Sequence, residues 1–503
     1  MRCTPGGTPS VLSTKMKSPM LRIMAVSAVI LGVFSAPARA ESLQEALSKA
    51  YLFNPTLKAA RAQLRATDEN VARAKAGFRP SVNGEVSRTL QNIDTSPSLA
   101  GQEGNFTSNN YSVTLVQPIF RGFRTINAVQ GAQAGVEAGR EDLRAAEQTV
   151  LLNAVTSYVN VVRDQAVLNL QINNQRVLTQ QLKAAQDRFE VGEVTKTDVA
   201  QARARASGAE SAISQARAQL QADRAIFAQL VGNSPGTLRD PGPTRLVPKS
   251  QEASIKIGEG ENPNIIAAIF RERAQDHLIK ETKGELLPSV SLQANYTRST
   301  GGPGATDRED VGTVTGVVNI PIYQGGEEYA RIRQGIETRS QLRHQIDEQR
   351  EFVRASIIAA WGNYTAARAQ IKSDQEQVDA NRVALAGVRE EEKVGQRTVL
   401  DVLNAEQELL NSEVSLATSR RDLVVASYEL LSAIGRISAA VVSLSVEQYD
   451  PTKHYDEVSN KWIGWDTSTE ESERAPIVLP VRAPGRTEGQ RNGGPAYTKG
   501  DLR

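Results

Sequence analysis

The sequence predicts a mostly α-helical, internally duplicated protein in which each copy carries one β-hairpin and one very long antiparallel helical hairpin. Three observations lead to this prediction. Asn54-Pro55 recurs as Asn262-Pro263, and Pro80 recurs as Pro288 at the same spacing. Short segments of alternating apolar and polar residues follow the second proline of each copy. The stretches 119–234 and 322–450 then contain no proline and are rich in Ala, Gln, Glu, Arg and Leu, which favour helices.

The first forty residues have the pattern of a secretory signal. Basic residues precede an apolar run over 23–33, and Ala38-Arg39-Ala40 forms a small-x-small cleavage site. The run is too short for a transmembrane helix, which needs about twenty residues. The single cysteine, Cys3, lies in this segment, so the mature chain is expected to lack thiols. That excludes a disulfide framework, a thiolate metal site and a cysteine nucleophile.

Composition excludes several other functions. Lysine and arginine total 59 against 57 acidic residues, so no nucleic-acid partner is expected. The histidines are scattered, and we predict neither a metal site nor another cofactor. Residues 232–236 match the G-x-S-x-G pattern, but a helix precedes Ser234 and a proline-rich linker follows, which is not the context of a nucleophile elbow. No phosphate-binding glycine loop is present, so we predict a protein that is not an enzyme and has no energy source of its own.

Each copy begins with a helix and a hairpin. Asn54 suits an N-cap and Pro55 the first helical turn, which predicts a helix from 55 to about 76. Alternation over 82–91 and 111–115 predicts two strands, and the second copy repeats them over 290–296 and 314–320. The predicted organisation is a first repeat over 41–235, a linker over 236–261 and a second repeat over 262–437.

The proline-free stretches predict two long helical hairpins. Apolar residues recur every seven positions, which favours coiled-coil packing: Val129, Val136, Leu143 and Val150, and then Ile357, Tyr364, Ile371, Val378 and Leu385. A single helix over 125–190 would be about 100 Å long at roughly 1.5 Å per residue. The turn glycines, Gly192 and Gly395, suit a left-handed backbone, and the following helices should start at Thr195 and Thr398.

The strands have one apolar face and one polar face, which suggests lipid on one side and water on the other. Four strands cannot close a barrel, and open edges are not tolerated in lipid. We therefore expect several protomers to share one membrane β-barrel. Polar faces rich in Ser, Asn, Gln and Thr favour a barrel wide enough to hold water.

Three further motifs carry a resemblance to a known family. Residues 117–122 read QPIFRG, residues 320–325 read IPIYQG, and residues 394–402 read VGQRTVLDV. With the duplicated plan, they resemble the TolC family of trimeric outer-membrane channels over about 42–437. The resemblance implies a homotrimer with a twelve-stranded barrel in outer-membrane lipid and an α-helical tunnel through the periplasm. It also implies an exit duct for small-molecule efflux or type I protein secretion, coupled through a periplasmic adaptor to an inner-membrane pump.

The same resemblance places the helix–turn–helix tips at a periplasmic gate. Thr197, Asp198 and Arg397 match gate positions of the family, and Glu392 stands where its best-known member has a tyrosine. Asp401 matches one residue of a double-aspartate constriction whose second position here is Asn404. The turns themselves are candidates for adaptor contact: Val191, Gly192, Val394 and Gly395.

Local sequence gives the two aspartates a second role that is compatible with gating. Thr195-x-x-Asp198 and Thr398-x-x-Asp401 are capping-box signatures directly after a turn glycine.

Beyond the second repeat, we expect residues 438–465 to pack on the outside of the tunnel and residues 466–503 to be disordered. Two other functions explain the sequence less well. A soluble periplasmic coiled-coil scaffold would leave the two alternating hairpins unexplained. A secreted serine hydrolase would depend on Ser234, which has no convincing histidine partner.

Overall fold

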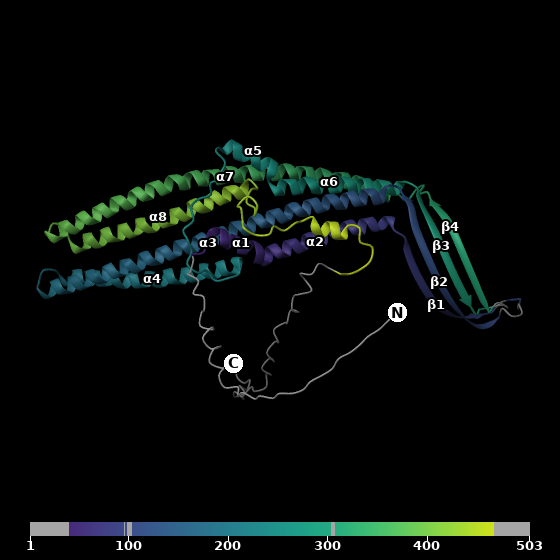
Figure 1. Ribbon diagram of the computed structural model, residues 1–503, viewed down its shortest axis with the longest axis horizontal. Helices are drawn as coiled ribbons and strands as arrows, with labels where there is room; N and C mark the ends of the chain where they lie inside the picture. The colour runs from purple at the N-terminus through teal and green to yellow at the C-terminus, as the bar shows by residue number, and fades with distance from the viewer. Residues whose placement is uncertain (1–39, 95, 98–102, 303–306, 467–503) are drawn as a thin grey trace, which may run out of the picture.

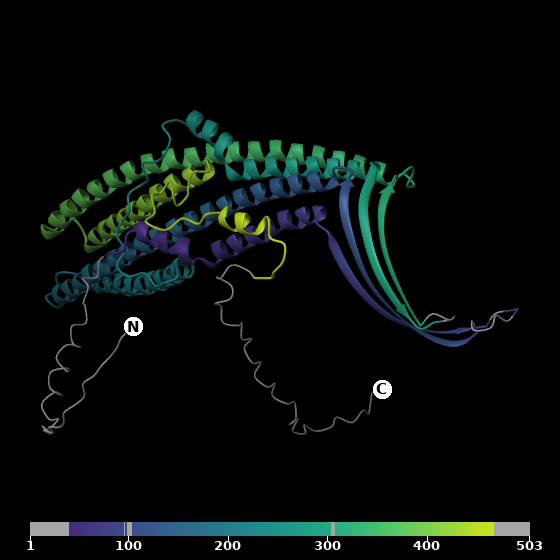
Figure 2. The same ribbon diagram turned by 45° about the vertical axis from the view of Figure 1, so that its right-hand side comes forward.

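The structure, a computed structural model, describes residues 40–94, 96–97, 103–302 and 307–466. It is an elongated molecule with a bundle of long helices at one end and a curved β-sheet at the other (Figures 1 and 2). The predicted signal segment, apart from residue 40, and the tail beyond residue 466 lie outside the described residues.

The helices follow the same order in both copies. The first copy contains α1, α2, α3 and α4, and the second contains α5, α6, α7 and α8, with a short helix α9 after them. A short 3-10 helix follows α2 and another follows α6. The bounds are: α1 Leu43–Phe53, α2 Pro55–Lys75, η1 Ala76–Phe78, α3 Arg124–Glu190, α4 Lys196–Val231, α5 Gln251–Glu261, α6 Pro263–Lys283, η2 Gly284–Leu286, α7 Glu327–Lys393, α8 Val399–Ala433 and α9 Lys453–Val458.

One boundary prediction was wrong. The predicted linker over 236–261 ends in a regular helix, α5, which stands before Asn262 as α1 stands before Asn54. Gly258 lies on this helix and is buried, and an added Cβ there would approach the Ile357 side chain to 2.3 Å. The glycine in α5 therefore serves close packing against α7.

The two Asn-Pro pairs are built identically. Asn54 accepts a hydrogen bond from the Thr56 backbone N–H at 2.9 Å, and Asn262 accepts one from Asn264 at 3.0 Å. Each asparagine also donates through Nδ2 to a carbonyl near the end of the last helix of its own copy, Leu230 or Ala433, at 3.0 Å. The predicted N-caps are thus confirmed, and each also ties the start of its copy to the last helix of that same copy.

The sheet contains four antiparallel strands in the order β1-β2-β3-β4. Directly paired residues share a face, and the pairs Val82 with Leu115, Val113 with Tyr296, and Ala294 with Val314 place the apolar side chains on one side. The opposite side is mostly polar, with apolar exceptions that include Val116, Val311 and Val317. Within the described residues, the outer edges of β1 and β4 have no strand partner. The bounds are: β1 Ser81–Ile93, β2 Gly104–Arg121, β3 Ser289–Thr300 and β4 Arg308–Asn319.

The long helices form two antiparallel hairpins, α3 with α4 and α7 with α8, as predicted (Figure 1). Both α3 and α7 run for 67 residues. The main core lies around the middle of the bundle, where Tyr158 and Phe227 are fully buried. A second, alanine-rich cluster lies closer to the tips and includes Ala202, Ala206 and Leu403. Small side chains there allow the helices to approach closely.

After α8 the chain turns back across the first copy as a strap over residues 438–466. The Tyr449 backbone N–H donates to the Tyr51 hydroxyl at 3.0 Å. His454 Nδ1 lies 3.1 Å from Oδ2 of the fully buried Asp68, whose pKa burial raises. The strap therefore packs on α1 and α2.

In the described part of the chain, no helix combines the length and the apolar character that crossing a membrane would require.

Candidate functional site at the helix tips

The two helical hairpins end side by side at the pole of the molecule opposite the sheet (Figure 1). Gly192 and Gly395 adopt left-handed backbone angles, with φ of 79° and 77°, and so reverse the chain as predicted. Val191 and Val394 precede them and are exposed. The tips therefore present two apolar side chains to the surroundings at matching positions.

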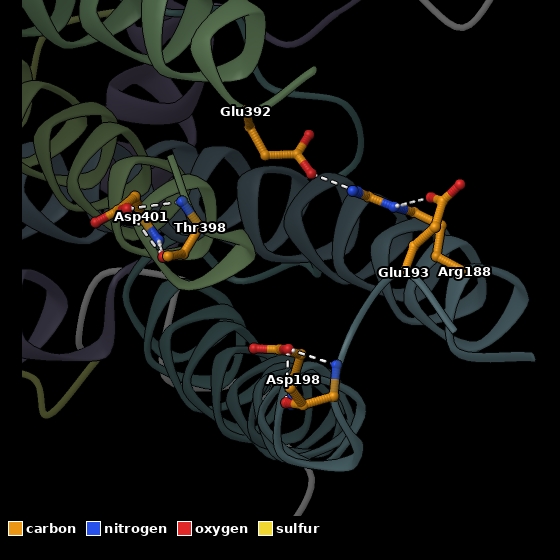
Figure 3. A network of polar contacts seen from close by, with 7 residues as sticks. Arg188, Glu193, Asp198, Glu392, Thr398 and Asp401 are labelled. Carbon is orange, nitrogen blue, oxygen red and sulfur yellow. Dashed lines mark hydrogen bonds and ion pairs between the residues drawn. The ribbon is translucent and has the colours of Figure 1, made fainter. Parts of the chain in front are cut away.

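Both predicted capping boxes form. The Asp198 backbone N–H donates to Thr195 Oγ1 at 3.3 Å, and the Thr195 N–H donates to Asp198 Oδ2 at 2.9 Å. Thr398 and Asp401 repeat this pattern with the same two distances. Hydrogen bonds from the threonine side chain and backbone lower the pKa of Asp198, and those from the Thr398 backbone and side chain lower the pKa of Asp401. Figure 3 shows these hydrogen bonds, which favour the ionised form of both carboxylates.

An ion pair joins the two hairpins. Arg188, in the last turn of α3, pairs through Nη1 with Glu392 of α7 and through Nε with Glu193 at 3.2 Å (Figure 3). The Glu392 side chain is mostly buried. The hydrogen bond to Glu392 raises the pKa of Arg188. Glu392 was predicted as a gate position, but Arg188 was missed, because nothing local in the sequence indicates that these two residues meet.

A second link lies on the following helices. Arg205 of α4 donates through Nη2 to Asn404 Oδ1 of α8 at 3.0 Å. Asn404, predicted at the constriction, is exposed. At the tips, the described residues thus form two polar links between the hairpins, and in each the arginine comes from the first copy.

The remaining predicted gate residues lie apart from these links. Arg397 donates through Nε to Glu391 of its own hairpin at 2.9 Å, and this bond raises the pKa of Arg397. Its charge also acts on Asp401, not on Asp198 of the other hairpin. Thr197 lies exposed in the first turn of α4. Thus each predicted gate residue lies at the tips, and Arg397 contacts its own hairpin.

A groove of about 810 Å³ runs along the tip of the first hairpin, between α3 and α4. Leu182, Phe189 and Val199 are apolar residues of its lining. Charges of both signs lie beside them: Lys183, Lys196, Arg203, Asp187 and Glu190. Such a groove has the apolar and polar mixture of a surface that receives a partner helix.

Comparison with known proteins agrees with this architecture. A family model described as outer membrane efflux protein matches residues 46–233 and 258–436. The outer membrane efflux protein BepC of Brucella suis biovar 1 (strain 1330) is 39% identical over 432 residues, covering 86% of this chain and 93% of that protein. The outer membrane protein TolC of Escherichia coli (strain K12) is 26% identical over 429 residues, covering 81% and 85%.

Among solved structures, the Campylobacter jejuni CmeC outer membrane channel superposes with a TM-score of 0.72 at 17% identity, covering 83% of this chain and 89% of that one. This likeness supports the fold: a helical tunnel joined to strands of a membrane barrel. The rival function of a soluble scaffold finds no support in these comparisons. The chain belongs to the outer membrane efflux protein family, and it is a TolC-type outer-membrane channel that provides an exit duct for efflux or type I secretion.

Proposed function

We propose that three copies of this chain form the channel, with twelve strands in the outer membrane and a continuous helical tunnel in the periplasm. The supporting observation is the sheet, which has one apolar face and two edges without partners within the described residues. Unpaired backbone groups cost several kcal/mol each in lipid, so β1 of one copy should pair with β4 of the next until the ring closes.

Native mass spectrometry of the channel extracted from outer membranes tests this stoichiometry. The expected mass is that of three mature chains. A dominant species of one chain, or a ring of another size, would contradict the proposal.

The tips would act as the gate of this tunnel. In the proposed closed state, the Arg188–Glu392 ion pair holds the two hairpins of each protomer together. Asp401 supplies a ring of three carboxylates that attracts cations, while Asn404 leaves the adjacent ring uncharged. Thr197, Asp198 and Arg397 complete the gate through contacts with neighbouring copies. Because ion pairs that water can reach are weak, docking of a partner could open them.

Single-channel conductance in planar bilayers tests the gate. Glu392→Gln and Arg188→Gln should each raise the conductance of the closed channel, and the charge swap Arg188→Glu with Glu392→Arg should restore it. Glu390→Gln is a matched control, since Glu390 pairs within its own helix, with Lys393 at 2.7 Å. Arg397→Ala combined with Asp198→Ala should also leave the channel leaky. Unchanged conductance in all of these variants would refute the gate.

The channel would be passive and coupled through a periplasmic adaptor to an inner-membrane pump. The adaptor's helical hairpin would contact the exposed turns, Val191-Gly192 and Val394-Gly395, and the groove between α3 and α4. Val191→Asp with Val394→Asp should abolish export in cells while trimer yield and conductance stay normal. Export that persists in this double variant would place the adaptor elsewhere. Cargo would be selected by the inner-membrane partner.

A further inference from the structure

Three large apolar side chains lie exposed at the end of the described chain. Trp462 is 66% exposed, Ile463 89% and Trp465 98%. They follow α9 at the end of the strap. Neither the tunnel nor the gate uses them. Large exposed apolar groups gathered in one short segment mark a surface that contacts a partner or a membrane.

The structure fixes this segment beside the start of the sheet. Arg79 lies two residues before β1, and its Nη1 donates to the Lys461 carbonyl at 2.7 Å. The Arg79 guanidinium also stacks on the Trp462 ring, with 4.7 Å to the ring centroid. Lys75, in the last turn of α2, donates to Asn460 at 2.8 Å. The end of the strap is therefore anchored at the level where the helices give way to the membrane strands.

Other residues at this level have matching chemistry. Phe78, Phe123 and Tyr323 lie just outside strand ends, and all three are exposed. Two cations lie against the same segment, Arg79 on the Trp462 ring and Lys75 on Asn460, and both carry charge that phosphate groups attract. Aromatic rings together with Lys and Arg are characteristic of the boundary between a bilayer and water.

We propose that Trp462, Ile463 and Trp465 insert into the headgroup region of the periplasmic leaflet of the outer membrane. The partner is phospholipid, with apolar contacts to the upper acyl chains and phosphate near Lys75 and Arg79. This surface continues the lipid contact of the sheet's apolar face onto the helical part of the molecule. The strap thereby ties α2 to the membrane, whatever the state of the gate.

The chain offers a clean test, because it contains only three tryptophans. Trp361→Phe with Trp465→Phe leaves Trp462, and Trp361→Phe with Trp462→Phe leaves Trp465. Trp462→Phe with Trp465→Phe leaves Trp361 as the matched control. Trp361 lies on α7, 34 residues from the start of that helix and so about 50 Å from the sheet.

Each single-tryptophan channel would be reconstituted in phosphatidylethanolamine–phosphatidylglycerol vesicles with bromine near the carbonyl end of the acyl chains. Trp462 and Trp465 should each show at least about a twofold loss of fluorescence relative to unbrominated vesicles, while Trp361 should not change. Free quenching by aqueous acrylamide without bromine quenching would overturn the proposal, because the segment would then lie in water. Protection from both quenchers would also overturn it, and would show that a neighbouring copy covers the tryptophans.

Discussion

The helices α3 and α7 have the same length and the same place in the two copies, yet they are buried to very different extents. Seventeen residues of α3 are buried, against eight of α7. The helix α3 lies at the centre of the protomer and packs on α1, α2, α4, α6 and α8, whereas α7 packs on α5, α6 and α8. The two copies contain the same elements, but the long helix at the centre of the protomer comes from the first copy.

Equivalent positions show the consequence for the outer helix. Val155 of α3 is fully buried, whereas Ile358, at the same place in α7, is 44% exposed. Phe352 of α7 is 66% exposed, and its counterpart in α3 is the polar Thr149. In the proposed trimer, we expect a neighbouring protomer to cover this apolar face of α7.

The largest expected difference between the two helices concerns their aromatic residues. Tyr158 is fully buried, and its hydroxyl donates to the Glu41 or Arg239 carbonyl, each at 2.7 Å. Tyr158→Ala should destabilise the channel by about 3–5 kcal/mol, because a large cavity forms and the hydroxyl no longer donates to a carbonyl or accepts from the Arg239 backbone N–H. The counterpart Trp361 is only partly buried, and Trp361→Ala should cost less. Thermal unfolding compares the two, and equal losses would mean that α7 is as buried as α3 in the assembled channel.

The next prediction tests whether another protomer contacts α7. Phe352→Glu should weaken protomer association by about 2–3 kcal/mol per interface, because a charge would be buried without a partner. Thr149→Glu is the matched control on α3, where the residue is exposed. Native gels should show a loss of trimers for the first variant and not for the second. Intact trimers in both would place Phe352 outside the interface.

A smaller, pH-dependent effect is expected in the first copy alone. Burial, together with Asp223, raises the pKa of Asp164 to about 6. The equivalent positions in the second copy are Ala367 and Ala426. The Asp164 carboxyl ionises at a lower pH in the unfolded chain than in the folded one. As the pH rises toward 6, the free energy of unfolding therefore falls, and above pH 6 it falls no further on this account. At low pH Asp164 is protonated in both states and this loss of stability disappears.

Asp164→Asn should therefore stabilise the channel by on the order of 1–2 kcal/mol at about pH 8 and have little effect at about pH 4. Melting temperatures at the two pH values measure this, with the exposed Asp142→Asn on the same helix as control. An equal gain at both pH values would indicate that packing, not ionisation, sets the change.

The smallest effect should be the same in both copies. Thr195→Ala and Thr398→Ala each remove one capping box, and each should cost about 1 kcal/mol. Hydrogen exchange should show faster opening of the first turn of α4 in the first variant and of α8 in the second. Strongly unequal responses would mean that one of the two threonines also contacts another protomer.

Local signals made much of the fold predictable. Three signals depend only on residues close by in the sequence, and the structure contains each as predicted: Asn54 with Pro55, the turn glycine Gly192 and the Thr195 capping box. The long helices were equally clear, because a seven-residue repeat without proline permits few alternatives.

The features that were missed depend on contacts between distant segments. The helix α5 contains two glycines, which are typical of a linker. Gly258 is needed there because the Ile357 side chain of α7 leaves no room for a Cβ. Arg188 and Glu392 meet only because both hairpins end at the same level. For the same reason, the sequence located the tips correctly but could not identify the ion pairs that join them.

The two free edges of the sheet also bear on how the channel is made. An incomplete ring would expose unpaired backbone N–H and C=O groups to lipid at both of its edges. Such a ring would therefore be unstable in the bilayer. Insertion and oligomerisation should therefore occur as one step. One chain with a defective strand edge would then prevent closure of any ring that contains it. Mutations that disrupt β1 or β4 should therefore be dominant negative when the normal protein is also present.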